Sequence, residues 1–255
     1  MTPAFETCRV TALIGPFGSG KSELALGLAL HRAGQLAVAR AEGAPVAPVV
    51  VVDLDVLKPY FRSREVGDRM SAEGVALLAP RAALANTDLP IISAEMRGAV
   101  EQPDAQVVLD VGGDPVGARA LGSMADVVGV TEYDLLLVLN RHRPFMDTAD
   151  HVVEHARQIV AASCLRLTGV ISNTHMLDET SAADVAWGLE LARQVAAALD
   201  VPVRLLAVPA HLASEAHALA PDLPVVAIRR RMLPEFLGGV VLAAPRPLAR
   251  KGNQS

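Results

Sequence analysis

Residues 15–22 read Gly-Pro-Phe-Gly-Ser-Gly-Lys-Ser and fit the pattern G-x-x-x-x-G-K-[ST] at every fixed position. An apolar, β-branched stretch at 9–14 precedes the pattern, and a helix-forming stretch at 22–30 follows it. The order strand, glycine loop, helix is the one that this motif requires. The chain is therefore predicted to carry a phosphate-binding loop after its first strand.

Each fixed position of this loop has a physical reason. Glycines allow backbone angles and close approaches that a Cβ would block, so successive N–H groups can point at phosphate oxygens. Lys21 would reach the β- and γ-phosphates, and the Ser22 hydroxyl would ligate Mg²⁺. A glycine-rich turn that binds nothing is the alternative. The predicted phosphate-site residues are Gly15, Gly18, Ser19, Gly20, Lys21 and Ser22.

Eight strand-like runs recur along the chain, and most are continuous apolar stretches. This pattern is typical of strands buried on both faces of a parallel sheet. The runs span 8–14, 48–54, 74–78, 105–111, 135–140, 167–172, 203–208 and 225–228. Hydrophobic residues make up 51% of the chain and aromatic residues only 3%, so the core is expected to consist of aliphatic side chains.

Helical stretches are predicted between these runs, with Ser93 and Ser181 as helix starts. They span 22–33, 93–101, 116–125, 148–162 and 181–199. The alternation predicts an α/β fold of three layers, with a mostly parallel sheet of seven to eight strands. We expect one domain over 1–245 and a polar C-terminal tail over 246–255.

Charge and cysteine content narrow the function classes. The net charge of −5 argues against broad, non-specific nucleic-acid binding, and no specific nucleic-acid partner is predicted. Cys8 and Cys164 form no C-x-x-C pair, and both thiols are expected in the core of a protein from a reducing cytoplasm. The first residues lack the pattern of a secretory signal, and no apolar run approaches the roughly 18 to 20 residues of a membrane span. We therefore expect a cytoplasmic protein with no membrane span.

Two strand-like runs end in acidic residues. Asp53 and Asp55 lie at the end of the second run, where one of them could hold a Mg²⁺-bound water or orient the attacking water. The fourth run ends in Asp110, which matches the Walker B pattern of an aspartate that holds Mg²⁺ through water. The sequence from Asp110 to Gly113 also fits D-x-x-G, in which a glycine N–H contacts the γ-phosphate. An acidic turn without a catalytic role is the alternative for 53–55.

These motifs, in this order, resemble the MinD/ParA and CobQ/CobB type of nucleotide-binding domain over roughly residues 8–235. The resemblance implies Mg-ATP binding, a mostly parallel sheet and a nucleotide-dependent homodimer. ParA and MinD relatives carry a second lysine directly after the first loop glycine, where this chain has Pro16. Arg62 or Arg64 could supply that charge, or Lys58, Arg62 and Arg64 form a solvated basic surface.

The resemblance also places Asn173 where this class reads the base with an amide side chain. The guanine pattern N-K-x-D is absent, because Thr174 and Met176 replace its lysine and aspartate, so adenine is favoured. Pro209 lies where the family packs backbone and proline against the base. A turn or capping asparagine is the alternative for Asn173.

Two further patterns are open at this point. Arg141, His142 and Arg143 follow a strand end and could contact a phosphate, a substrate or an acidic partner; the alternative is a loop held by local hydrogen bonds. His151 and His155 belong to H-x-x-E-H, an inverted zincin pattern. An exposed polar helix face is the favoured interpretation of these histidines.

The sequence as a whole predicts a Mg-ATP-binding phosphate-loop ATPase that acts as a nucleotide-dependent switch on an unidentified protein partner. Lys21 with Asp53 or Asp55 would carry the hydrolysis. The alternatives are a carboxylate-activating enzyme similar to dethiobiotin synthetase or cobyrinic-acid amidase, and an adaptor that binds nucleotide without turnover.

Overall fold

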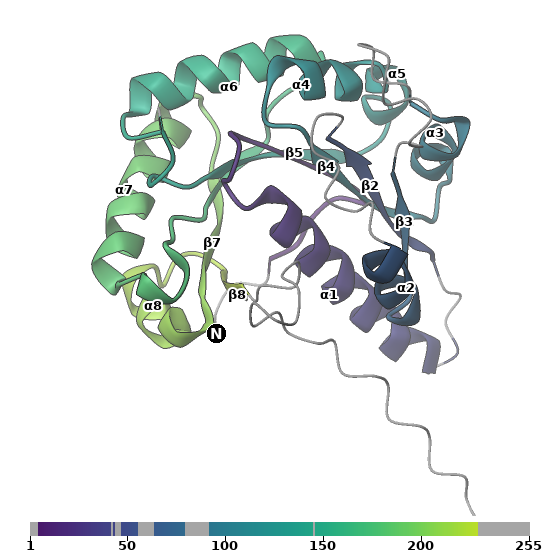
Figure 1. The fold of residues 1–255 in the computed structure, drawn as a ribbon, viewed down its shortest axis with the longest axis horizontal. Helices are drawn as coiled ribbons and strands as arrows, with labels where there is room; N and C mark the ends of the chain where they lie inside the picture. The colour runs from purple at the N-terminus through teal and green to yellow at the C-terminus, as the bar shows by residue number, and fades with distance from the viewer. Residues whose placement is uncertain are drawn as a thin grey trace, which may run out of the picture.

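Eight strands form one all-parallel sheet in the order β3-β2-β4-β1-β5-β6-β7-β8 in the described part of the chain (Figure 1). The computed structural model describes residues 5–41, 43, 47–55, 64–79, 92–144 and 146–228. The strands are β1 (Val10–Ile14), β2 (Val49–Leu54), β3 (Val75–Leu78), β4 (Gln106–Val111), β5 (Tyr133–Leu139), β6 (Gly169–Ser172), β7 (Val203–Pro209) and β8 (Val225–Ile228). This confirms the predicted α/β fold with a parallel sheet.

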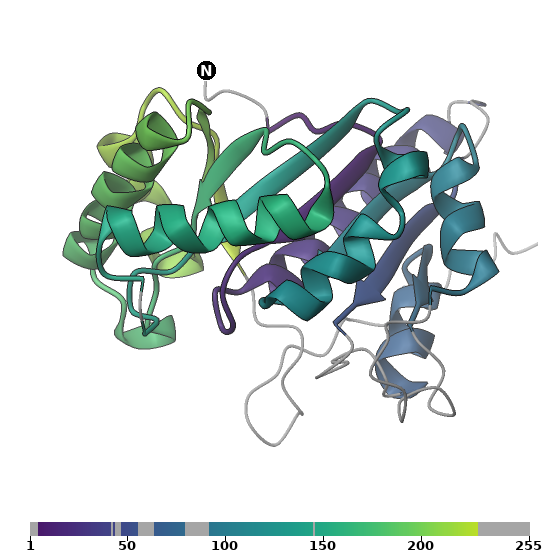
Figure 2. The ribbon, with the colours of Figure 1, turned by 90° about the horizontal axis from the view of Figure 1, so that it is seen from above.

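Helices cover both faces of this sheet, as Figure 2 shows. They are α1 (Lys21–Ala41), α2 (Arg64–Ala72), α3 (Ala94–Glu101), α4 (Pro115–Gly122), α5 (Ala125–Val128), α6 (Ala149–Ser163), α7 (Ala182–Ala198) and α8 (Ala213–Leu219). Helices α3, α4, α6 and α7 pack on one face, and α1 and α2 pack on the other. Helix α8 packs with α7 against β7.

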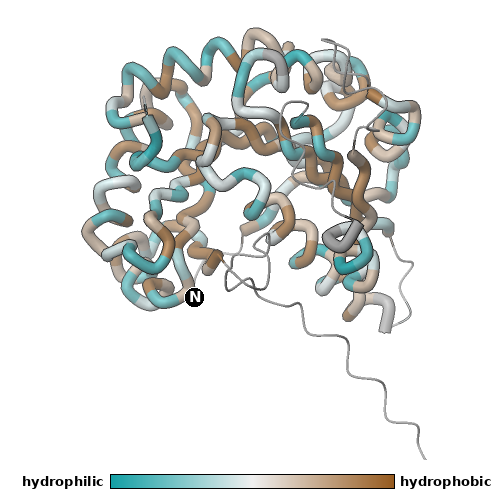
Figure 3. Tube along the Cα trace, viewed as in Figure 1, coloured by the Kyte–Doolittle hydropathy of each residue, from teal (hydrophilic) through white to brown (hydrophobic). Residues whose placement is uncertain are grey.

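Alternate side chains of the central strand serve the two halves of the core. Val10, Ala12 and Ile14 of β1 join the cluster under α3, α4, α6 and α7, whereas Leu13 joins the cluster under α1. The most hydrophobic stretches of the chain follow the strands through the middle of the molecule (Figure 3). The continuous apolar runs of the sequence are therefore strands with both faces covered, as predicted.

All eight predicted strands are present, and the helix starts at Ser93 and Ser181 are correct. Each serine caps its helix by accepting a hydrogen bond from a backbone N–H, of Met96 and Asp184 respectively. Asp184 in turn accepts from the Ser181 N–H, which completes a capping box.

Several helix bounds differ from the prediction. Helix α1 continues to Ala41 because the alanine-rich stretch after residue 33 is itself a strong helix former. The predicted helix over 116–125 is two helices, α4 and α5. At the end of α4, a Cβ on Gly122 would overlap the Ala162 carbonyl oxygen, so this glycine allows close packing on α6. Helices α2 and α8 were not predicted.

The expectation that both thiols are core residues is wrong. Cys164 is exposed at the C-terminal cap of α6, and Cys8 is only half-buried. Both cysteines are free thiols. In the described part of the chain, no helix combines the length and the apolar character needed to cross a membrane. The predicted tail over 246–255 lies outside the described residues.

Candidate functional site

The glycine loop connects β1 to α1 at the carboxyl edge of the sheet. Gly15, Gly18 and Gly20 all have positive φ angles, of 141°, 76° and 93°. A Cβ on Gly15 would overlap the Val138 carbonyl oxygen on β5, and one on Gly20 would overlap the Asn173 side chain. The backbone angle therefore favours glycine at all three positions, and at Gly15 and Gly20 there is also no space for a Cβ.

Lys21 lies buried across this loop, with 7% of its surface exposed. Its Nζ donates to the Pro16 carbonyl oxygen at 3.1 Å. Burial lowers the pKa of Lys21, and the carboxylates of Asp110, Asp55 and Asp114 oppose that shift. Lys21, the first residue of α1, thus places a desolvated ammonium group next to the loop, where three carboxylates interact with its charge.

Ser22 and Asp110 are in direct contact. The Ser22 hydroxyl donates to Asp110 Oδ2 at 2.5 Å. Asp110 is 2% exposed, and its other oxygen, Oδ1, has no hydrogen-bond partner among the described residues. Burial raises the pKa of Asp110 to about 6, although Lys21 and the Ser22 hydrogen bond lower it. A hydroxyl beside a buried carboxylate with an unpartnered oxygen fits Mg²⁺, which binds oxygen ligands.

The two acids at the end of β2 are placed differently. Asp53 is fully buried, and its Oδ1 accepts a hydrogen bond from the Asp55 N–H at 2.8 Å. Asp55 is half-buried, and its negative charge raises the pKa of both Lys21 and Asp110. The Asp55 carboxylate therefore acts on the loop lysine, and the Asp53 carboxylate accepts the hydrogen bond that closes the turn at the strand end.

The loop after β4 packs directly against the glycine loop. A Cβ on Gly113 would lie 2.7 Å from the Phe17 nitrogen and 2.9 Å from the Gly15 carbonyl oxygen. A Cβ on Gly112 would lie 3.1 Å from Gly117 Cα. Gly113 therefore lies directly against backbone atoms at the start of the phosphate loop.

We expect Gly113→Ala to destabilise the protein by about 1–3 kcal/mol. The added methyl group would overlap backbone atoms of the phosphate loop, which cannot move aside by a change of rotamer. Gly98→Ala is the matched control. Nothing lies within 4 Å of a Cβ at this helical glycine, so that exchange should stabilise α3 by about 0.5–1 kcal/mol. Chemical denaturation of both variants measures these changes; equal effects would show that Gly113 has space for a side chain.

Asn173 has a contact that the sequence did not predict. It is buried directly after β6, and its Nδ2 donates to the Ser19 carbonyl oxygen at 2.7 Å. Its Oδ1 has no hydrogen-bond partner in the described part of the chain. Pro209 ends the neighbouring strand β7. Both residues lie at the carboxyl edge of the sheet, and their role in reading a base stays a prediction.

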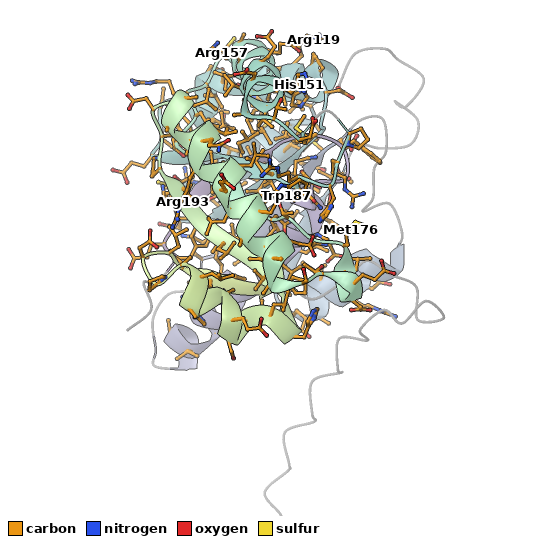
Figure 4. All side chains as sticks on the ribbon, turned by 90° about the vertical axis from the view of Figure 1, so that its left-hand side faces the viewer. Arg119, His151, Arg157, Met176, Trp187 and Arg193 are labelled. Atoms are coloured by element: carbon orange, nitrogen blue, oxygen red, sulfur yellow. The ribbon has the colours of Figure 1, made fainter. Side chains whose placement is uncertain are left out.

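Arg141 and His142 turn toward α7. The Arg141 guanidinium lies 4.1 Å from the centre of the Trp187 ring, and its Nη1 donates to the Trp187 carbonyl oxygen at 2.7 Å. His142 Nε2 lies 3.4 Å from Asp184 Oδ1, and its ring centre lies 5.3 Å from that of Trp187. Trp187 is on the face of α7 that Figure 4 presents to the viewer. Arg141 and His142 thus contact residues in the N-terminal half of α7.

Arg143 is the member of this group that reaches the phosphate loop. Its Nε donates to the Gly18 carbonyl oxygen at 2.7 Å. Lys58 and Arg62, the other cationic candidates, lie outside the described residues, and the side chain of Arg64 does as well.

The H-x-x-E-H histidines have unlike surroundings. His151 is exposed, and its Nδ1 lies 3.4 Å from Asp147 Oδ1. His155 is half-buried, so the prediction of an exposed polar face is wrong for this residue. Burial and the charge of Lys21 lower the pKa of His155, and Asp114 opposes the shift. No group of three or more potential metal ligands occurs among the described residues.

His155 should make the protein less stable in acid. Because its pKa is lowered in the folded state, the unfolded chain binds the proton more readily as the pH falls through about 6.5. The free energy of unfolding of the wild type should therefore fall more between pH 7.5 and 5.5 than that of His155→Gln. His151→Gln is the control at the exposed site. Identical pH profiles for wild type and His155→Gln would contradict the burial of a neutral imidazole.

Asp114 and His155 both lie near Lys21, and neither was predicted to do so. Asp114 directly follows the D-x-x-G pattern, and its Oδ1 accepts a hydrogen bond from the Gly117 N–H at 2.8 Å. Its position after this pattern is a sequence signal that could have placed Asp114 near the phosphate loop. Nothing in the sequence indicates that His155 lies near Lys21, because the two residues are on different helices.

The chain is similar to several solved structures of proteins. No protein-family model matches the chain, and no curated protein matches its sequence. Among solved structures, the signal recognition particle receptor FtsY from Elizabethkingia anophelis is similar at 21% identity, with 80% of this chain and 60% of that chain covered and a TM-score of 0.46. The signal recognition particle 54 kDa protein from Aeropyrum pernix K1, in complex with GDP, has 19% identity, with 80% and 42% covered and a TM-score of 0.49.

The cell division protein FtsY from Thermotoga maritima has 16% identity, with 81% of this chain and 63% of that chain covered and a TM-score of 0.49. The chain thus spans less than two thirds of the length of each of these structures. At these identities and TM-scores the likeness assigns neither a nucleotide nor a partner to this chain. The resemblance to the MinD/ParA/CobQ type stays a prediction.

Proposed function

We propose that this protein binds Mg-ATP at the loop 15–22 and hydrolyses it. One observation carries the proposal. The buried ammonium group of Lys21 lies across a glycine loop directly beside the Ser22 and Asp110 pair, whose carboxylate has a buried oxygen without a partner among the described residues. A cation and a set of oxygen ligands beside a glycine loop at the start of a helix suit a metal-bound polyphosphate.

The proposed mechanism gives each residue one task. The loop amides and Lys21 hold the phosphates, and Ser22 and Asp110 would hold Mg²⁺. The metal ion would neutralise charge that develops on the phosphate oxygens. Asp55 orients the attacking water, because its carboxylate acts electrostatically on both Lys21 and Asp110. Gly113 responds to the γ-phosphate.

The contact between the two loops supports a switch. Loss of the γ-phosphate would release the segment 112–117, whose Gly113 packs on the phosphate loop against backbone atoms. This movement would change the grip on a protein partner or on a second copy of the chain. We propose adenine as the base, read by Asn173 beside Pro209, because the guanine pattern is absent.

A carboxylate-activating enzyme is the less supported alternative. It would need a pocket for the acid beside the γ-phosphate, lined by Arg141, His142 and Arg143. Arg141 and His142 instead contact Trp187 and Asp184, and Arg143 donates to the Gly18 carbonyl oxygen. An adaptor that binds nucleotide without turnover differs from the proposal only in the chemical step.

Phosphate release and size in solution test the proposal together. We expect hydrolysis of ATP in preference to GTP, dependence on Mg²⁺, and a change in light scattering between ADP and a non-hydrolysable ATP analogue. Binding without phosphate release would support the adaptor. Release that needs a small carboxylic acid and yields a new product would support the enzyme. Preference for GTP would contradict the assignment of the base.

A further inference from the structure

The side chain of Arg143 lies against the outside of the phosphate loop. Besides the hydrogen bond from Nε to the Gly18 carbonyl oxygen, its Nε, Cδ and Cζ lie 3.2–3.4 Å from the place of a Cβ on Gly18. The charged end of the arginine therefore rests on the bare backbone of the fourth loop residue. A hydrogen bond from a guanidinium group is charge-assisted and stronger than a neutral one.

A hydrogen-bonded turn after β5 places Arg143 next to the phosphate loop. The Arg143 N–H donates to the Asn140 carbonyl oxygen at 3.0 Å. Asn140 is fully buried, with its Oδ1 accepting from the His142 N–H and its Nδ2 donating to the His175 carbonyl oxygen. The Met146 N–H closes the turn by donating to the Arg143 carbonyl oxygen at 3.1 Å. The position of Arg143 is thus set by the end of β5, the strand that pairs with β1.

Two neighbouring loop carbonyls are held from outside. Arg143 binds the Gly18 carbonyl oxygen, and Asn173 binds the Ser19 carbonyl oxygen. In a trans peptide the carbonyl and the following N–H point in opposite directions. Holding these two carbonyls therefore directs the N–H groups of Ser19 and Gly20 to the opposite side of the loop.

The opposite side is where Lys21 lies. The Ser19 N–H donates to the Pro16 carbonyl oxygen at 3.2 Å, and Lys21 Nζ donates to the same oxygen at 3.1 Å. Arg143 thus supports the orientation of the amides from one side while Lys21 provides a positive charge on the other. The second loop position, Pro16, carries no charge.

We infer that Arg143 completes the anion site in cis. It positions the Gly18 peptide and adds a positive charge from the same chain behind the loop, so that the diphosphate group of ADP is bound without a cation from a second subunit. This inference rests on the proposed function. It predicts that the affinity for ADP and for pyrophosphate is independent of protein concentration.

Calorimetric titration with ADP and with inorganic pyrophosphate, each with Mg²⁺, tests the inference. Arg143→Met removes charge and donor, Arg143→Gln removes the charge but keeps an N–H donor, and Arg143→Lys keeps the charge. We expect Arg143→Met and Arg143→Gln to weaken both ligands by about tenfold to a hundredfold. Arg143→Lys should stay within about fivefold of wild type. Arg157→Met, on the exposed side of α6 (Figure 4), is the charge-matched control and should bind like wild type.

Salt dependence separates the charge from a merely structural contact. The slope of log Kd against log salt concentration should fall in Arg143→Gln and Arg143→Met and stay unchanged in Arg143→Lys. Wild-type affinity in all three variants would overturn the inference and leave the proposed function intact. Full rescue by Arg143→Gln would overturn the charge role. Failure of the wild type to bind either ligand would overturn both proposals. If Arg143→Met does not fold, the comparison of Arg143→Lys with Arg143→Gln decides.

Discussion

Lys21→Ala is expected to weaken binding of ATP and ADP by at least about a hundredfold, which corresponds to about 2.7 kcal/mol. Lys21 is 7% exposed and its ammonium group donates to a loop carbonyl oxygen, so its charge acts on a bound phosphate with little screening by water. A titration of the folded variant with Mg-ATP measures the loss.

The control for this variant is Arg119→Ala, which removes a positive charge from an exposed position on α4. Its affinity should equal that of the wild type. Lys21→Ala also leaves Asp110 without the cation that lowers its pKa, so the melting temperature of each variant is measured first. ATP binding by folded Lys21→Ala at wild-type affinity would show that the loop is not the phosphate site.

Asp110→Asn is expected to remove the dependence of nucleotide binding on Mg²⁺. In the wild type, Mg²⁺ should tighten ATP binding by about tenfold to a hundredfold; in the variant, by less than about threefold. An asparagine can still accept the hydrogen bond from the Ser22 hydroxyl, so the local structure should be kept. Titrations with and without the metal measure both ratios.

The same exchange should raise the stability of the metal-free protein. Asp110 is buried among the core strands, and an ionised carboxylate in that position is costly without a bound cation. Asp104→Asn, at an exposed turn, is the control for the loss of one negative charge. If Mg²⁺ tightened ATP binding to Asp110→Asn as strongly as to the wild type, another residue would be the metal ligand.

The strands were predictable because most of them are continuous apolar runs between turn residues, and the central strands are buried on both faces of the sheet. The helix starts at Ser93 and Ser181 were predictable from local capping chemistry. The length of α1 was not, since Gly34 within an alanine-rich stretch does not end a helix that packs on the sheet. The exposure of Cys164 follows from a left-handed helix cap that no local pattern indicates.

The site was predictable only where one motif contains all of its parts. The loop and its lysine follow from eight consecutive residues. The contacts of Asn173 with Ser19 and of Arg143 with Gly18 join residues 154 and 125 positions apart, and they depend on which strands are neighbours in the sheet. Likewise, the sequence does not show that the Asp53 carboxylate accepts the hydrogen bond from the Asp55 N–H. The proposed role of Asp55 in orienting water depends on the conformation of this turn.

Calorimetric titration of the wild-type protein with Mg-ATP decides whether the loop 15–22 is a phosphate site. We predict one binding site per chain, with a Kd of about 100 μM or tighter, and loss of that binding in Lys21→Ala. A folded wild-type protein that binds no ATP, ADP or GTP at about 1 mM ligand would contradict it, because the loop would then have the form of a phosphate site without its affinity.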